Sequence, residues 1–272
     1  MKKTISKKII SLLLVFAMGM TVLTGCSNEG VATDASATTD TTQTTAEGAT
    51  SATDTLTIGL YSEIISLDSA FAYDFVTNPV VIQITEGLLY YDENDELQCG
   101  LAESWESVDD VTYVYNVRDD VNFSDGTPMT MDDVMFSIER YQDPDVASYV
   151  AWMYDNVESI EVTGDWQFTV HLSQPDALWE HTFATTAGHI HSKAYVEAHP
   201  DDYGTPEGGV LGTGPYEYVS WDVGSQIVMK YNENYWDKSV NPQIKNLVFQ
   251  IVEEDTTRVM ASTSGQIDIN LS

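Results

Sequence analysis

Short segments in which hydrophobic and polar residues alternate recur along the chain after residue 55, and an alternation of period two predicts β-strands. The pattern predicts single strands at 56–61, 104–108, 112–117 and 121–123, hairpins at 88–100 and 157–172, and further strands at 216–221, 225–231, 244–252 and 267–271. Helical segments lie between several of these strands. The combination predicts a mixed α/β fold.

Apolar residues at helical spacing occur in the segments between the strands. The first helix is predicted to start at Asn78, as the cap, followed by Pro79, and to bury Val80, Val81, Ile84 and Leu88. Thr130 followed by Asp133 predicts the start of a second helix. Shorter helices are predicted at 177–183 and at 256–262, the latter capped by Asp255. The final strand, helix and strand form a βαβ unit, which requires parallel strands.

The first 54 residues have a different composition from the rest of the chain. Four lysines precede an apolar stretch at 9–23, which is short for a membrane span and is followed by Leu23-Thr24-Gly25-Cys26. This pattern predicts a lipoprotein signal peptide at 1–25, with a lipid on Cys26. Residues 26–54 are rich in Ser, Thr, Ala and Asp and contain no aromatic residue, so we expect a disordered tether.

Net charge and cysteine content narrow the possible partners. The chain has 11 Lys and Arg and 43 Asp and Glu, and four of the lysines precede Cys26. The segment from Cys26 onward therefore carries 7 − 43 = −36, so nucleic acid is not expected as a partner. With a lipid on Cys26, Cys99 has no second cysteine to pair with, and a disulfide framework is excluded.

Motifs of enzymes are missing from the sequence. It contains no G-x-S-x-G, no P-loop and no dinucleotide-binding fingerprint. The acidic pairs 109–110, 119–120, 132–133 and 201–202 are predicted at turns and helix starts, where adjacent carboxylates point in different directions. The acidic segment 92–97 lacks the glycine of a calcium loop and is predicted as a hairpin tip. We therefore expect no enzymatic activity and no cofactor, and a hydrolase ranks last among the alternatives.

Histidines form the one constellation that could bind a metal. Four of the five lie between His181 and His199, and His189 and His191 would lie on the same side of a strand. No cysteine accompanies them. Nearby carboxylates are abundant in any chain this acidic, so metal capture by His189 and His191 is a weak alternative.

Several long motifs, in order, resemble one protein family. "LAESWES", "TYVYNVRDDVNFSDGTPMTMDDVMFSIER", "GTGPYEYVSWDVGSQIVMKYNENYW" and "SGQIDI" resemble the extracytoplasmic solute-binding proteins of family 5. Such proteins are the oligopeptide, dipeptide and nickel-type binding components of ABC importers. The resemblance covers residues 55–272 and implies a type II periplasmic-binding-protein-like fold. It implies the first lobe, from 55–88 and 176–271, with an extra α+β subdomain at about 89–175. The second lobe would follow residue 272, so the end at Ser264–Ser272 is interpreted as a cut at the hinge.

The resemblance also implies a function and a set of ligand contacts. The chain would be a monomeric, lipid-anchored, extracytoplasmic protein that captures a peptide or similar solute between two lobes and delivers it to membrane permease subunits. A metal or metal-chelate ligand, as in nickel-type relatives, is the alternative. Residues expected on the cleft side are Ser66, Leu67, Asp68, Phe71, Tyr73, Tyr216 and Asn270. Packing alone is an equally good interpretation for Tyr216.

Overall fold

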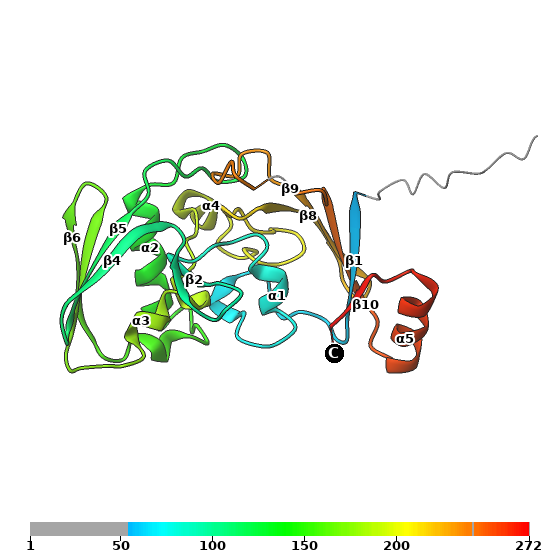
Figure 1. Ribbon diagram of the computed structural model, residues 1–272, viewed down its shortest axis with the longest axis horizontal. Coiled ribbons are helices and arrows are strands. Elements are labelled where there is room, and N and C mark those ends of the chain that lie inside the picture. Colours follow the sequence, from blue (N-terminus) through cyan, green and yellow to red (C-terminus); the bar gives the residue numbers. More distant parts are fainter. Residues whose placement is uncertain (1–53, 241, 272) are drawn as a thin grey trace, which may run out of the picture. The chain divides into compact units, whose positions relative to one another are not determined.

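A five-stranded sheet, a four-stranded sheet and a two-stranded hairpin, with short helices between them, make up the part of the protein that the computed structural model describes, residues 54–240 and 242–271 (Figure 1). The larger sheet has the strand order β11-β1-β10-β9-β8. Its strands are β1 (Thr55–Leu60), β8 (Tyr216–Asp222), β9 (Gln226–Tyr231), β10 (Asn246–Ile251) and β11 (Ile269–Asn270). The predicted signal peptide, tether and Cys26 lie outside the described residues.

Strand β1 lies inside the larger sheet and joins distant parts of the chain. It pairs in parallel with β10, with Ile58 opposite Phe249, and on its other side in parallel with β11, with Ile58 opposite Ile269. Helix α5 (Asp255–Ser264) connects β10 to β11. The predicted parallel βαβ unit is therefore confirmed, although β1 separates its two strands.

The smaller sheet is antiparallel and has the order β4-β5-β7-β6. Its strands are β4 (Ala102–Asp109), β5 (Thr112–Val117), β6 (Val157–Gly164) and β7 (Gln167–Leu172), and the hairpin of β2 (Leu89–Tyr91) and β3 (Leu97–Cys99) precedes it. The predicted strand at 121–123 is wrong: Asn122 forms only an isolated bridge to Pro128. Gly126, at φ +87°, makes the tight turn between these two residues, which leaves too little chain for a ladder.

Helices are short except for α2 (Met131–Gln142) and α5. The others are α1 (Asn78–Val81), α3 (Trp179–Thr182), α4 (Lys193–Ala198) and the 3₁₀ turns η1 (Ser69–Phe71), η2 (Ala151–Tyr154) and η3 (Thr186–Gly188). The predicted capping box of α2 is confirmed, because Thr130 and Asp133 exchange backbone and side-chain hydrogen bonds. No helix within residues 54–240 and 242–271 combines the length and apolarity needed to cross a bilayer.

Two predicted helix caps are wrong by one or more residues. Asn78 lies inside α1, and the carboxylate of Asp74 accepts from the backbone N–H groups that precede the helix. At α5, Glu254 rather than Asp255 accepts from the first-turn N–H groups. Asp255 instead forms an ion pair with Arg258 one turn later. Val80, Val81, Ile84 and Leu88 are fully buried as predicted, but α1 ends at Val81, so the predicted helix is too long and Ile84 and Leu88 lie beyond it.

Each sheet has its own hydrophobic core. The core of the larger sheet includes Leu60, Ile84, Tyr216 and Phe249. The core of the smaller sheet is rich in aromatic residues, including Tyr115, Phe168, Trp179 and Phe183, and extends along the chain to Ile190. The ring of Phe168 stacks on Tyr115 at 5.0 Å and meets Phe183 edge-on at 5.9 Å. Such contacts stabilise the core beyond the burial of area alone.

Replacement of Phe168 with alanine should lower the free energy of unfolding by roughly 3–5 kcal/mol, because the fully buried ring leaves a cavity. Phe75→Ala is the matched control. Its ring is 91% exposed, so the expected change is within about 0.5 kcal/mol. Urea unfolding of both variants measures the difference, and equal losses would contradict this assignment of the core.

Candidate functional site

The segment that follows β1 is fixed by polar contacts of its own residues. Ser66 donates from its hydroxyl to the carbonyl of Gly204 and accepts from the N–H of Asp68. Asp68 in turn caps η1 by accepting from the N–H of Ala70 at 3.0 Å. A short acidic or hydroxyl side chain at this position satisfies an N–H that the turn leaves unpaired. Leu67 is fully buried beside them.

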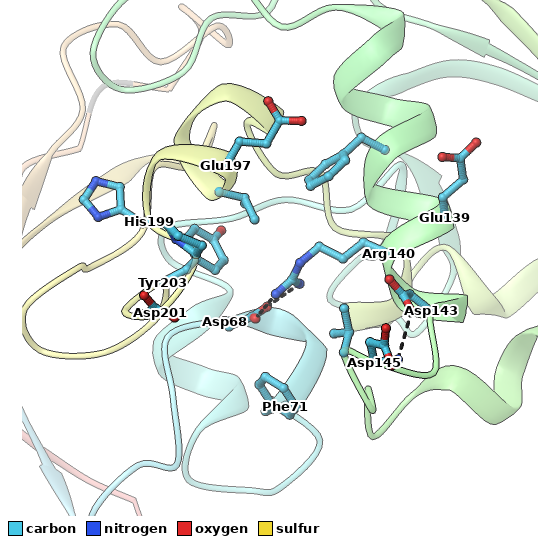
Figure 2. A pocket seen from close by; sticks show the side chains of 14 residues that line it. Asp68, Phe71, Glu139, Arg140, Asp143, Asp145, Glu197, His199, Asp201 and Tyr203 are labelled. Atoms are coloured by element: carbon cyan, nitrogen blue, oxygen red, sulfur yellow. Dashed lines mark hydrogen bonds and ion pairs between the residues drawn. The ribbon is translucent and has the colours of Figure 1, made fainter.

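Asp68 also forms a buried ion pair with Arg140 of α2 (Figure 2). Arg140 donates from Nη1 to Oδ1 at 3.1 Å and from Nη2 to Oδ2 at 2.5 Å, so both carboxylate oxygens are engaged. The side chains of Asp68 and Arg140 are only 2% and 11% exposed. A bidentate pair of this kind fixes the relative orientation of the two groups as well as their distance.

Next to the ion pair, a network of buried polar side chains joins three segments. The ring of His191 lies between hydroxyl groups, with Nε2 2.8 Å from Ser69 Oγ and 2.9 Å from Tyr141 Oη, and Nδ1 2.6 Å from Tyr203 Oη. Tyr141 donates to the carbonyl of His189, whose Nδ1 lies 2.7 Å from Thr85 Oγ1. Partners for both nitrogens of His191 offset the cost of burying this residue.

The environment of the two histidines is typical of structural residues. Burial lowers the pKa of His189 to about 3 and that of His191 to about 4, because a charged imidazole would lose its hydration. No group of three or more His, Cys, Asp or Glu that could hold a metal ion occurs in residues 54–240 and 242–271. Neither the burial nor the hydrogen bonds of His189 and His191 favour a metal site.

A cavity of about 570 Å³ opens beside the ion pair (Figure 2). Asp68, Phe71 and Tyr203 contribute to its walls, and Arg140 is the one lysine or arginine that lines it. The remaining polar residues are mostly acidic: Glu139, Asp143, Asp145, Glu197 and Asp201. Because Arg140 is already paired with Asp68, the walls present a negative surface with no unpaired cation.

Exposed apolar side chains gather on a different surface, which we call the aromatic groove. It consists of three hollows of about 430, 510 and 520 Å³, all of which Thr185 lines. Tyr73 and Phe75 line one hollow, Trp152 and Leu178 another, and Tyr90 and Tyr91 the third. These side chains are between 42% and 91% exposed. Clustered exposed rings around a hollow are typical of a binding surface.

The rings of the aromatic groove hold one another in place. Tyr73 and Trp152 meet edge-on, with centroids 6.3 Å apart. Tyr91 stacks on His181 at 5.9 Å, and its hydroxyl lies 2.7 Å from His181 Nδ1. The groove therefore brings together the loop after η1, the η2 turn and the end of the β2 strand. Such preformed apolar walls are suited to the side chains of a small ligand.

One carboxylate at the edge of the groove has an unusual pKa. The two oxygens of Glu86 accept from Tyr235 Oη at 2.8 Å and from Trp236 Nε1 at 2.9 Å. Removal from water outweighs these bonds and raises the pKa of Glu86 to about 7. The hydrogen bonds of Glu86 fasten the segment at 235–236 to the chain that follows α1.

The structure brings together some of the sequence-predicted ligand contacts and separates others. Four of them hold the loop in place: Ser66 and Asp68 by hydrogen bonds, and Leu67 and Phe71 by packing against the two cores. Tyr73 is exposed in the groove. Tyr216 is buried in the core of the larger sheet, where it donates to the carbonyl of Ile244. The amide oxygen of Asn270 accepts from Arg258 Nε at 2.8 Å. These seven residues stay predictions as ligand contacts.

Sequence reasoning missed two exposed rings of the groove, Phe75 and Trp152. Phe75 and Trp152 lie in short irregular segments, so no helical or strand pattern singles them out. One signal was available for Phe75: it is a large apolar residue three positions before the predicted helix start at Asn78, outside any periodic pattern. Trp152 lies in a segment for which the sequence predicts no element, so nothing indicates that its ring is exposed.

Comparison with known proteins places the chain among extracellular binding proteins. The model of the bacterial extracellular solute-binding proteins, family 5 Middle, matches residues 96–272. The periplasmic oligopeptide-binding protein OppA of Salmonella typhimurium is 28% identical over 76% of this chain and 41% of its own length. The match therefore spans less than half of that relative.

Solved structures have the same fold. The PBP AgaA from A. tumefaciens R10, in complex with agropinic acid, gives a TM-score of 0.73 at 27% identity, over 79% of this chain and 43% of that one. Haemophilus influenzae OppA, in complex with the peptide RPPGFSPFR, gives 0.73 at 26% identity, over 80% and 45%. The predicted α/β fold of a periplasmic binding protein is confirmed, and the matched segments are again less than half of each neighbour.

Removal of Arg140 should be severely destabilising. In Arg140→Met the carboxylate of Asp68 stays buried without its partner, and we expect the free energy of unfolding to fall by about 3–5 kcal/mol. Lys230→Met, which removes the exposed ion pair with Glu217, should leave it nearly unchanged. The double variant Arg140→Met/Asp68→Asn should lose less than the sum of the two single losses. Additive losses in urea unfolding would contradict the coupling.

The pKa values of His189 and Glu86 predict opposite effects of pH. A histidine with a folded-state pKa near 3 stabilises the fold fully above pH 6.5 and loses this contribution as the pH falls. Between pH 7 and pH 5, His189→Gln should therefore lose about 2 kcal/mol less stability than wild type.

Glu86 acts in the other direction, because a carboxyl group with a raised pKa stabilises the fold at low pH and loses this contribution as the pH rises through 7. Between pH 7 and pH 5, Glu86→Gln should lose about 2 kcal/mol more than wild type. Urea unfolding at both pH values measures how the stability of each variant, relative to wild type, changes with pH. Changes of equal sign for His189→Gln and Glu86→Gln would refute the assigned pKa shifts.

Proposed function

Because the chain belongs to the bacterial extracellular solute-binding proteins of family 5, we propose that it binds a peptide or a similar small solute and delivers it to the permease of an ABC importer. The aromatic groove carries the proposal. Tyr73, Phe75 and Trp152 expose large apolar surfaces that a folded domain normally buries. The protein would act by binding and release, without an enzymatic step.

We propose that residues 55–88 and 176–271 form the main part of one lobe and residues 89–175 an extra subdomain. The ligand would lie against the aromatic groove, and a second lobe would close over it from the other side. Closure removes water from the ligand and strengthens the few polar contacts that orient it. The core of the larger sheet contains only residues of the proposed main lobe, whereas the core of the smaller sheet also includes Trp179 and Phe183 from that lobe.

We further propose that the protein acts outside the cytoplasm as a lipoprotein. Residues 1–25 would be the signal peptide, Cys26 the lipid attachment site and 26–54 the tether that lets the domain move above the membrane. Seven Lys and Arg against 43 acids in the segment from Cys26 onward leave little attraction to an anionic membrane surface. Attachment would then depend on the lipid.

Residues around the groove have separate roles in this proposal. Tyr73 would contact the ligand, and Phe75 and Trp152 would add apolar surface on either side of it. Ser66 and Asp68 would act indirectly, because their hydrogen bonds hold the loop that carries Tyr73. Loss of such a loop anchor would weaken binding through a misplaced wall.

Nuclear magnetic resonance titration of the 272-residue chain with an uncharged-side-chain tripeptide that contains phenylalanine tests the proposal, because it detects millimolar affinity. We expect shifts at Tyr73, Phe75, Trp152 and Thr185. Trp152→Leu should weaken binding by roughly 2–10-fold, the contribution of one aromatic contact. Val108→Ser, an exposed apolar position on β4, is the control and should bind as wild type. Absence of shifts at millimolar peptide, or shifts confined to other surfaces, would refute the proposal.

A further inference from the structure

The charged residues that line the aromatic groove are all acidic. The described residues include all seven lysines and arginines that follow Cys26, and none of them lines any of the three hollows. Carboxylates line all three: Asp74 beside Tyr73 and Phe75, Asp155 and Asp176 beside Trp152, and Glu86 in the third hollow. A ligand in the groove thus meets negative charge and aromatic rings together.

Some of these carboxylate oxygens have no hydrogen-bond partner among the described residues. Asp176 accepts from the N–H of Leu178 and from Asn156 Nδ2, both at 2.9 Å, so both of its oxygens are engaged. Asp155 is exposed, and its carboxylate has no hydrogen bond or ion pair within residues 54–240 and 242–271. Oδ2 of Asp74 is buried and likewise has no hydrogen-bond partner among the described residues.

The ionised state of Asp74 follows from its surroundings. Burial by itself would raise the pKa of Asp74, but the hydrogen bonds from Thr77 and Val76 to Oδ1 outweigh it and lower the pKa overall. The carboxylate of Asp74 is therefore negative at neutral pH while one of its oxygens lacks a donor. Asp155 therefore presents the exposed acceptor that a ligand could reach, and Asp74 adds a buried negative charge to the wall of another hollow.

The rings are arranged to take part in the same contact. Trp152 and Asp155 belong to one turn of the chain and line the same hollow. The rings of Trp152 and Tyr73 are in edge-on contact, and about half of each side chain stays exposed. An ammonium or guanidinium group over an aromatic face is attracted by the ring, and a nearby carboxylate adds to that attraction. The aliphatic stem of a lysine or arginine also packs well on apolar surface.

We propose that the aromatic groove selects peptides in which a lysine or arginine side chain lies next to an apolar residue, with Asp155 and Trp152 as the main contacts of the cation. This inference rests on the proposed function, since it names the class of peptide for the same surface. An anionic peptide would meet carboxylates and no lysine or arginine there, and would be rejected.

Three peptides that differ in one side chain test the selection: Ala-Phe-Lys-Ala, Ala-Phe-norleucine-Ala and Ala-Phe-Glu-Ala. Norleucine keeps the aliphatic stem and removes the charge. In titrations of the 272-residue chain at 150 mM salt, we expect the lysine peptide to bind about tenfold more tightly than the norleucine peptide, and the glutamate peptide most weakly. At this ionic strength distant charges are largely screened, so the preference reports local contacts.

Asp155→Asn should reduce the preference for lysine over norleucine to about threefold, with little effect on the norleucine peptide itself. Asp165→Asn, an exposed aspartate at the turn between β6 and β7, removes the same charge elsewhere and should leave the preference unchanged. An equal effect of the two variants would assign the preference to the net charge of the protein and overturn the proposal.

The two proposals fail in different ways. Equal affinity for the lysine and norleucine peptides, with shifts at Tyr73 and Trp152, would overturn the selection for cations and leave peptide binding intact. No binding of any of the three peptides would refute the proposed function itself.

Discussion

The ion pair of Asp68 and Arg140 is the contact on which the arrangement of the two cores depends. It joins the segment after β1, which follows the larger sheet, to α2, which packs with the smaller sheet. Both charges are almost fully buried, so each requires the other. His191, Ser69 and Tyr203 continue the polar network around the pair. Hydrogen bonds in such a network have definite directions, so they define one relative position of the segments, where apolar packing alone would allow several.

The position of the aromatic groove follows from this anchor. The loop that carries Tyr73 and Phe75 is fixed at one end by Asp68, within the buried network, and at the other by Asp74, which accepts from two backbone N–H groups before α1. The two carboxylates hold the segment in shape while Tyr73, which lies between them, and Phe75, directly after Asp74, stay exposed. A surface with exposed rings on a rigid loop is ready for a ligand at a low cost in conformational entropy.

Much of the fold was predictable because it is encoded locally. The period-two alternation of β5, β7, β9 and β10 and the Thr130–Asp133 capping box require only neighbouring residues, and both were correctly predicted. Helix caps were predicted less well. At α1, Asp74 acts from outside the helix, and a sequence offers several residues that could do so.

The site was predictable only in part, since exposure is a property of the folded chain. Asp68 was singled out from the sequence, but its partner Arg140 lies 72 residues away, and nothing local connects them. Phe75 and Trp152 are residue types that usually lie in a core. Only the arrangement of three distant segments around Thr185 leaves their rings at the surface. The histidine pair shows the converse: a pattern that suggests metal chemistry proves to be a buried, hydrogen-bonded part of the interior.

The place of β1 between β10 and β11 in the larger sheet has a consequence for how the protein acquires its structure. Thr55 of β1 lies opposite Asn246 of β10, 191 residues along the chain. The backbone N–H of Thr57 donates a hydrogen bond to the carboxylate of Asp268, 211 residues away. When the chain emerges N-terminus first, β1 has no neighbour in the sheet until 191 further residues have followed. An unpaired strand in that interval is open to wrong partners. All strands of the smaller sheet lie before the partners of β1 in the sequence. We therefore expect the smaller sheet to form first and the larger sheet to be completed last.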